Sequence, residues 1–390
     1  MNKINKSLAM AMLPLFFSCH TMTDRNDAVT VVAESNTETL NDSMAQNVIE
    51  SVAFIPLEAS EECVLGNVRK IQVYNDDVYV MADGKQRLCE LYRFNSKGRL
   101  LNKVGNIGKS KSEYLRMASF FVLNKEVYVA DADNRKVLVY GVDGAFHRSY
   151  DCGESIMFLH NMTSLDDKTA AFSYNINFSE NKALYDIVDL STMKTLHTID
   201  TDFTAAGSYP FSLNEFCKEG ENLLLSVPFE NTIYRLNRDD YTLNDELHVD
   251  VWGNLPKLQT SDFTEAETAV EESGTGKLYG FFVSGDILIL NSLGSSVLWN
   301  KDIGKGLCVK NGTSINDAGC FPFFPLSITY SDEDGFYSAF NADEFLAIAQ
   351  NEDSAKHGNA TLNAVLEFVH NNMNPVIVKY KLKYPENAGC

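Results

Sequence analysis

The stretch Lys70-Ile-Gln-Val-Tyr-Asn-Asp-Asp-Val-Tyr-Val-Met-Ala-Asp83 has a close counterpart in Ser119-Phe-Phe-Val-Leu-Asn-Lys-Glu-Val-Tyr-Val-Ala-Asp131. In both, a run rich in apolar residues is followed by an Asn-containing pair and a Val-Tyr-Val run, which predicts two strands joined by a tight turn. Two further strands separated by a Gly-containing turn are expected after each stretch, at 91–100 and 137–146. Four antiparallel strands in about 40–50 residues are typical of one blade of a β-propeller.

The same pattern recurs along the chain and predicts six blades. Their second strands are expected to begin near Val78, Val127, Ala170, Leu223, Ile287 and Phe336. The last unit, which ends with a strand at 374–384, lacks a fourth strand, and the strand at 52–57 precedes the first unit, so we expect these two strands to pair. Apolar residues at helical spacing and an Asp262/Glu265 capping pair predict short helical insertions near 261–274 and 342–372. The predicted fold class is all-β: a six-bladed β-propeller closed by its N- and C-terminal strands.

One blade also resembles a known repeat. Val127-Tyr-Val-Ala-Asp-Ala-Asp-Asn-Arg-Lys-Val-Leu-Val-Tyr-Gly-Val-Asp-Gly-Ala-Phe146 resembles an NHL-type propeller repeat. Roughly residues 48–384 resemble the six-bladed β-propeller lipoproteins of anaerobic Gram-negative bacteria. Those typically have a Gly-x-x-Gly-x-Gly-Pro-x-Glu-Tyr loop between the first two blades and end near Asn-Pro-Val-hydrophobic-Val-x-Tyr.

This chain has Gly105-Asn-Ile-Gly-Lys-Ser-Lys-Ser-Glu-Tyr114 in the loop and Asn374-Pro-Val-Ile-Val-Lys-Tyr380 at the end. The loop departs from the family pattern at 109–112, where a Gly and a Pro are missing. The resemblance implies the fold. It implies little about chemistry, because propellers host binding, lyase and lactonase functions alike.

The N-terminus has the features of an export signal. Lys3 and Lys6 precede an apolar run that ends in Ser18-Cys19, the pattern at which bacterial lipoproteins are cleaved and lipidated on the Cys. We therefore predict a lipoprotein signal peptide at 1–18, lipidation of Cys19, a flexible tether at 19–47 and the propeller at 48–390. The alternative is an ordinary secretory signal that contains a Cys. In either case we expect an exported protein, and with lipidation one that is anchored to the cell envelope, periplasmic or surface-exposed.

The composition excludes several classes of function. The chain has 33 Lys and Arg against 53 Asp and Glu in 390 residues, a net charge of −20, whereas a nucleic-acid binder needs a basic surface. No apolar run is long enough for a transmembrane helix. The seven His residues show no metal-ligand spacing, so no metal and no cofactor are predicted.

A few residues are candidates for a site. Glu113 and Tyr114, in the loop after the first blade, are candidate ligand contacts, although Glu113 is also expected to accept hydrogen bonds from backbone N–H groups. The aromatic cluster Phe321, Phe323 and Phe324 is a candidate binding surface, or else blade packing. Cys308 and Cys320 flank a Gly/Asn-rich loop and form a candidate disulfide, or else both are small buried side chains.

Three functions remain open. The leading prediction is a non-enzymatic, membrane-anchored binding protein for an envelope protein, a peptide or a glycan, with the propeller as a monomeric domain. The alternative is a propeller hydrolase or lyase that uses axial carboxylates and a divalent metal. A third is a structural role in an envelope complex through the insertions at 342–372.

Overall fold

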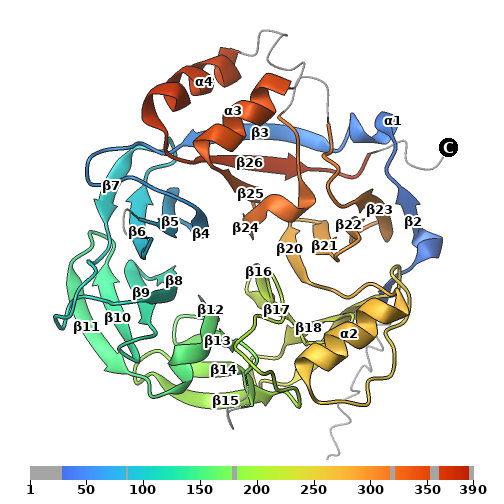
Figure 1. Ribbon diagram of the computed structural model, residues 1–390, viewed down its shortest axis with the longest axis horizontal. Helices are drawn as coiled ribbons and strands as arrows, with labels where there is room; N and C mark the ends of the chain where they lie inside the picture. Colours follow the sequence, from blue (N-terminus) through green and yellow to red (C-terminus); the bar gives the residue numbers. More distant parts are fainter. Residues whose placement is uncertain (1–28, 85–86, 178–181, 317–320, 352–359, 386–390) are drawn as a thin grey trace, which may run out of the picture.

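The computed structural model describes residues 29–84, 87–177, 182–316, 321–351 and 360–385, which fold into six four-stranded blades around a central axis (Figure 1). In each blade the first strand lies nearest the axis. These six strands are β4 (Val68–Tyr74), β8 (Met117–Leu123), β12 (Leu159–Ser164), β16 (Phe216–Glu219), β20 (Gly280–Ser284) and β24 (Ile328–Asp332). The prediction of an all-β, six-bladed propeller is confirmed.

The second and third strands form the middle of each blade. The second strands are β5 (Asp77–Asp83), β9 (Glu126–Asp131), β13 (Thr169–Tyr174), β17 (Asn222–Ser226), β21 (Ile287–Asn291) and β25 (Gly335–Phe340). The third strands are β6 (Cys89–Phe94), β10 (Lys136–Gly141), β14 (Ala183–Asp189), β18 (Thr232–Leu236), β22 (Ser295–Asn300) and β26 (Val376–Leu382). Each predicted second strand matches an observed one. At the first two hairpins both turn residues, Asn75-Asp76 and Asn124-Lys125, have positive φ, as two-residue hairpin turns of type I′ require.

The fourth strands lie at the outer rim and include the closure of the ring. They are β7 (Leu100–Lys103), β11 (Phe146–Asp151), β15 (Lys194–Asp200), β19 (Leu243–Val249), β23 (Lys305–Lys310) and, in the sixth blade, β3 (Ile49–Pro56). Strand β3 pairs antiparallel with β26, with Ile377 opposite Ile55. The predicted closure by the N- and C-terminal strands is therefore observed.

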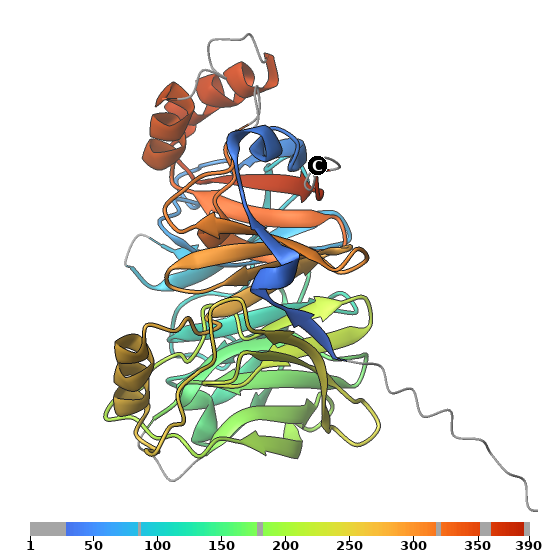
Figure 2. The ribbon, with the colours of Figure 1, turned by 90° about the vertical axis from the view of Figure 1, so that its right-hand side faces the viewer.

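The segment before β3 differs from the predicted tether. Residues 30–45 form β1 (Thr30–Val32), a 3-10 turn η1 (Glu34–Asn36), β2 (Thr37–Thr39) and α1 (Asp42–Ala45). Strand β1 pairs in parallel with β19, and β2 pairs in parallel with β23. Figure 2 shows this segment running along the side of the molecule. Because the outer strands of the fourth and fifth blades leave their backbone groups unpaired, a polar segment without a strand pattern can be ordered by pairing with them.

The helical insertions lie where they were expected. Helix α2 (Phe263–Ser273) begins after Asp262, whose Oδ1 accepts a 3.0 Å hydrogen bond from the Glu265 N–H, and ends at Gly274 with φ 70°. Helices α3 (Ala342–Asn351) and α4 (Ala360–Asn372) pack on the rim of the sixth blade (Figure 1). Short 3-10 turns η2 (Ser155–Phe158) and η3 (Pro325–Ser327) precede β12 and β24.

The core fills the space between successive blades. One cluster joins the first three blades through side chains such as Phe120, Tyr128 and Val139, and another joins the fifth and sixth blades to α3 and α4. Apolar side chains on both faces of each sheet are thereby removed from water, which is the main stabilising contribution to such a fold. Because the apolar core lies between the blades, the innermost strands can carry polar side chains where they face the axis.

Candidate functional site

The axis of the ring contains a cavity of about 1250 Å³. Its walls are mainly side chains of the six innermost strands β4, β8, β12, β16, β20 and β24 and of the segments next to them. Lys70, Ser119 and Asn161 are each the third residue of their strand, and they meet by hydrogen bonds. The innermost strands therefore run side by side in the same direction, and the cavity is the central channel of the propeller.

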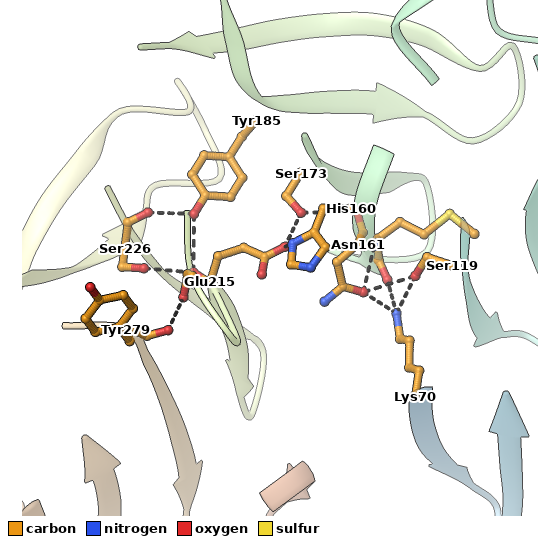
Figure 3. Close-up of polar contacts among 11 residues, drawn as sticks. Lys70, Ser119, His160, Asn161, Ser173, Tyr185, Glu215, Ser226 and Tyr279 are labelled. Carbon is orange, nitrogen blue, oxygen red and sulfur yellow. Dashed lines mark hydrogen bonds and ion pairs between the residues drawn. The ribbon is translucent and has the colours of Figure 1, made fainter. Parts of the chain in front are cut away.

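Lys70 is bound to two neighbouring blades. Its Nζ donates to Ser119 Oγ at 2.9 Å, to Asn161 Oδ1 at 2.6 Å and to the Met162 carbonyl at 2.7 Å (Figure 3). An ammonium group has three N–H donors, so protein acceptors use all of them. Burial lowers the pKa of Lys70 to about 7, and the negative charge of Glu215 acts in the opposite direction. Lys70 is thus a cation below neutral pH and loses its charge as the pH rises through about 7.

His160 and Glu215 form an ion pair beside this cation. His160 Nδ1 lies 3.3 Å from Glu215 Oε1, which also accepts a hydrogen bond from Ser173 Oγ (Figure 3). The Glu215 side chain is 0% exposed. Burial alone would raise the pKa of Glu215, but the His160 charge and the hydrogen bonds outweigh it and lower this pKa. Glu215 in turn raises the pKa of His160. Both groups are therefore held in their charged forms.

Further polar side chains join the innermost strands to one another. The Gln72 amide bridges β4 to the backbone of Val122 in β8, with contacts of 3.1 and 2.8 Å. Asn214 Nδ2 donates to the Phe281 carbonyl at 2.7 Å, and Ser331 Oγ accepts from the Val283 N–H at 3.2 Å. Neighbouring blades splay apart by sheet twist, so these side chains replace the backbone bonds that the strands cannot make with each other.

The two mouths of the channel differ in charge. Arg69 and Arg116, where β4 and β8 begin, pair with Asp83 at 2.8 Å and Asp133 at 2.6 Å. The charged residues that line the opposite mouth are mostly acidic. They are Asp76, Asp332, Glu333 and Asp334, with one lysine, Lys218. Burial raises the pKa of Asp332 and lowers that of Lys218. The two arginines of the first mouth are therefore each balanced by an aspartate, whereas the opposite mouth carries an excess of carboxylates.

The sequence of the chain matches the model of a known protein family. The model described as "Domain of unknown function (DUF4934)" matches residues 28–381. The chain belongs to the DUF4934 family. No curated protein sequence matches the chain.

Two crystal structures share the fold of this DUF4934 chain. One is a Bacteroides fragilis protein named as an exported protein, 16% identical, with a TM-score of 0.69 over 91% of this chain and 100% of that one. Another is a member of the DUF4221 family from Bacteroides vulgatus, 11% identical, with a TM-score of 0.51 over 87% of this chain and 99% of that one. At these identities the likeness supports the propeller fold. The NHL-type resemblance and lipidation stay predictions.

The first pair of predicted site residues lies in the loop between the first two blades. Glu113 Oε2 accepts a 2.9 Å hydrogen bond from the Ser110 N–H, which lowers the pKa of Glu113. A Cβ at Gly108 would lie 2.1 Å from this carboxylate, so any other residue there would displace the Glu113 side chain. The Tyr114 side chain is fully buried in the core between blades. Glu113 therefore acts as the expected backbone acceptor, and Tyr114 has no surface to offer a ligand.

The predicted aromatic cluster divides between core and surface. Phe321 and Phe323 are buried, and Phe321 stacks on Phe345 of α3 with ring centroids 4.8 Å apart. Phe324 is half-buried and lines a second, apolar groove of about 490 Å³ between α3 and the turn after β23. Only Phe324 of the three lies at a surface hollow.

The remaining predictions fall partly outside the described residues. Cys19 and Cys320 lie outside them, so lipidation and the Cys308–Cys320 disulfide stay predictions. Cys308 lies in β23 opposite Thr39 of β2, and burial raises the pKa of its thiol. In the described part of the chain, no three His, Cys, Asp or Glu side chains gather in a way that suits a metal ion. None of the helices described is long and apolar enough to cross a membrane.

Four channel residues were missed by sequence reasoning: Lys70, His160, Asn161 and Glu215. One signal was available, because Lys70 and Ser119 open the two aligned repeats and prove to be hydrogen-bonded partners. Polar residues at that position of a first strand mark the axis of a propeller. Glu215 gave no such signal, since it precedes a strand of only four residues, in a unit whose sequence was not aligned with the first two repeats.

Proposed function

We propose that this DUF4934 protein is exported, anchored to the cell envelope through a lipidated Cys19, and binds a small ligand in its central channel. One observation carries the binding part: the channel is a cavity of about 1250 Å³ lined by polar side chains from several blades. Ligand pockets typically have volumes of about 300–1,000 Å³ with a few convergent polar groups. A space of this size suits a short peptide or an oligosaccharide segment.

Sequence and fold support the envelope location. The N-terminal segment combines Lys3, Lys6, an apolar run and Ser18-Cys19. The structurally similar Bacteroides fragilis protein is named as an exported protein. Replacing Cys19 by Ala should move the protein from the membrane fraction to the soluble fraction of cells. Retention of the Cys19→Ala variant in the membrane fraction would contradict the anchor.

Blocking the channel tests the binding site. Ala118 lines the cavity, so Ala118→Trp fills part of it, whereas Leu196→Trp adds the same side chain on the outer strand β15. We expect some member of a library of short peptides and oligosaccharides to raise the melting temperature of the wild type and of Leu196→Trp, and to leave Ala118→Trp unchanged. A ligand that stabilises all three proteins equally binds elsewhere and contradicts the proposal.

One observation favours a second candidate function, catalysis in the same channel. Burial brings the pKa of Lys70 to about 7, where an amine can transfer protons near neutral pH. A hydrolase or lyase would convert its substrate with the wild type and lose this turnover in Lys70→Met. A ligand recovered chemically unchanged after prolonged incubation with the wild type supports binding alone.

A further inference from the structure

The charges around Lys70 do not balance. Lys70 and His160 contribute two positive charges, and Glu215 contributes one negative charge. Among the described residues, no carboxylate lies within ion-pairing distance of Lys70 Nζ. At the nearby mouth Asp83 and Asp133 are already paired with Arg69 and Arg116. The channel wall therefore holds one uncompensated positive charge, which is costly where water is partly excluded.

The Asn161 side chain is fixed by contacts of its amide oxygen, and no acceptor among the described residues bonds to its amide nitrogen. Asn161 Oδ1 accepts from Lys70 Nζ at 2.6 Å, from Ser119 Oγ at 3.0 Å and from the Met162 N–H at 2.9 Å. These three donors settle which end of the amide is oxygen. In Figure 3 the amide nitrogen points away from Lys70, on the side of the His160 ring. Asn161 and His160 both line the cavity.

His160 presents a second donor to the same space. Its Nδ1 faces Glu215 Oε1, so the other ring nitrogen, Nε2, is turned away from that carboxylate (Figure 3). When the imidazole is protonated both ring nitrogens carry a hydrogen. A fixed amide N–H₂ and an imidazolium N–H next to an unbalanced positive charge are the groups that recognise an oxyanion.

We infer that the ligand of this channel carries one carboxylate group, which binds to Asn161 Nδ2 and His160 Nε2 beside the Lys70 ammonium. This inference rests on the proposed binding function and specifies its ligand class. A single negative charge brings the sum of Lys70, His160, Glu215 and ligand to zero, whereas a phosphate dianion leaves a buried negative charge. Uronic acids and the C-terminus of a peptide both offer such a group.

Carboxylate binding should depend on pH. The groups that face the Lys70 ammonium are Ser119 of β8, Asn161 and the Met162 carbonyl of β12, and Glu215 before β16, with the Phe120 ring 5.5 Å away. Arg69 and its partner Asp83 lie on the mouth side. Loss of the proton from Lys70 or from His160 removes the positive charge that the ligand balances. With a Lys70 pKa of about 7, affinity falls about tenfold between pH 6 and pH 8.

Acetate is the probe that tests this inference. Full-length protein labelled with ¹⁵N-histidine is titrated with sodium acetate at pH 6, with sodium chloride and acetamide as controls at matched ionic strength. The ring signals of His160, assigned by their absence in His160→Gln, should shift and saturate with acetate alone, and about tenfold more acetate should be needed at pH 8. Absence of a saturable shift, or an equal shift with chloride, overturns the inference.

Three variants complete the test. Asn161→Asp places a carboxylate in the site and should abolish the acetate response, as should Lys70→Met, while Lys218→Met, at the opposite mouth, should keep it. The other histidine signals report whether each variant is folded. An acetate response that persists in Asn161→Asp overturns the inference.

Two comparisons then distinguish a uronic acid from a peptide C-terminus, and the carboxylate inference from the channel-binding proposal. Galacturonate is compared with galactose, and N-acetyl-alanyl-alanine with its amide; the acid of one pair should bind at least tenfold more tightly. Neutral ligands that bind as well as acids, and that Ala118→Trp excludes, leave the channel-binding proposal intact and overturn the carboxylate. If acetate binds but Ala118→Trp excludes no library ligand, the carboxylate site stands and the proposal that the channel holds a larger ligand is overturned.

Discussion

Asn374 Oδ1 accepts a hydrogen bond of 2.9 Å from the backbone N–H of Leu65, a residue 309 positions earlier in the chain. Its Nδ2 donates to the carbonyl oxygens of Glu58 and Cys63, both at 3.1 Å. One buried side chain therefore ties the loop after β3 to the start of β26. The Asn374-Pro375 ending of the chain has this physical role: its asparagine holds the closure of the ring.

Replacing Asn374 by Ala should lower the free energy of unfolding by about 2–4 kcal/mol, because it leaves several buried backbone groups without partners. Urea unfolding followed by tryptophan fluorescence measures this change. Asn371→Ala is the matched control, since Asn371 is exposed and, among the described residues, its side chain bonds to the Glu367 carbonyl of its own helix. An Asn374→Ala protein as stable as this control would show that the side chain does not hold the closure.

The two N-terminal segments should differ in importance. A chain that begins at Val48 loses β1 and β2, which pair with the outer edges of two complete blades, and the buried side chain of Val32, so we expect a folded protein with a lower melting temperature. A chain that begins at Glu58 also loses β3, the fourth strand of the sixth blade, and should show no cooperative transition by circular dichroism. Equal behaviour of the two truncations would contradict closure by β3.

Glu215→Gln should be most destabilising in a defined pH window. The pKa of Glu215 is lowered, so its contribution to stability is present above the unfolded value of about 4.3 and is lost as the pH falls through the lower folded value. The pKa of His160 is raised, so its contribution is present below about 6.5 and is lost as the pH rises through the higher folded value.

The ion pair is therefore worth most between about pH 4.5 and 6.5, where we expect Glu215→Gln to cost about 2–4 kcal/mol. Denaturant unfolding at a series of pH values checks this. Glu154→Gln, which removes an exposed partner of Arg135, should change stability by less than about 0.5 kcal/mol. A Glu215→Gln cost that is independent of pH would exclude the charged pair.

Lys70→Met should alter the pH dependence at the alkaline side. The pKa of Lys70 is lowered to about 7 in the folded state against about 10.4 unfolded, so the native state binds fewer protons between these values. Wild-type stability relative to Lys70→Met should therefore rise from pH 7 to pH 10, by at most ~1.4 kcal/mol per pH unit. Lys194→Met on the exposed strand β15 should run parallel to the wild type. A flat difference between Lys70→Met and the wild type would show that the ammonium is not desolvated.

Lys277 offers a double-mutant cycle beneath helix α2. Its buried ammonium pairs with Glu267 and lies 4.5 Å from the ring centroid of Phe229 and 4.4 Å from that of Tyr279. Glu267→Gln should cost about 3 kcal/mol because it leaves a buried charge unpaired, and adding Lys277→Met should recover part of that loss. Glu272→Gln, on the exposed side of α2, is the control for thermal unfolding. Strict additivity of the two substitutions would contradict the pairing.

Most of the fold was predictable because it depends on local signals. Alternating strands, two-residue turns such as Asn75-Asp76 and the cap at Asp262 each occupy a few consecutive residues. The closure was also predictable, since it needs only the count of strands in the last unit. Strands β1 and β2 were not, because three polar-flanked residues become a strand only when the edges of β19 and β23 are already present.

The channel was harder to predict than the blades. Lys70, Asn161 and Glu215 belong to three different blades, and their proximity follows from the ring and from no spacing in the chain. The aromatic residues near 321–324 were plausible ligand contacts because aromatic side chains often bind sugars and peptides. Phe321 and Phe323 are instead buried, where they pack against α3 and β26.

The pairing of β3 with β26 sets the order in which this protein can be made. Ile55 finds its partner Ile377 only after almost the whole chain has been synthesised. Until β26 has been made, β3 has no strand to pair with, and the sixth blade cannot form. Contacts of such long sequence separation slow folding. During synthesis the unfinished ring therefore exposes unpaired strand edges, which favour aggregation, until the last strand is present.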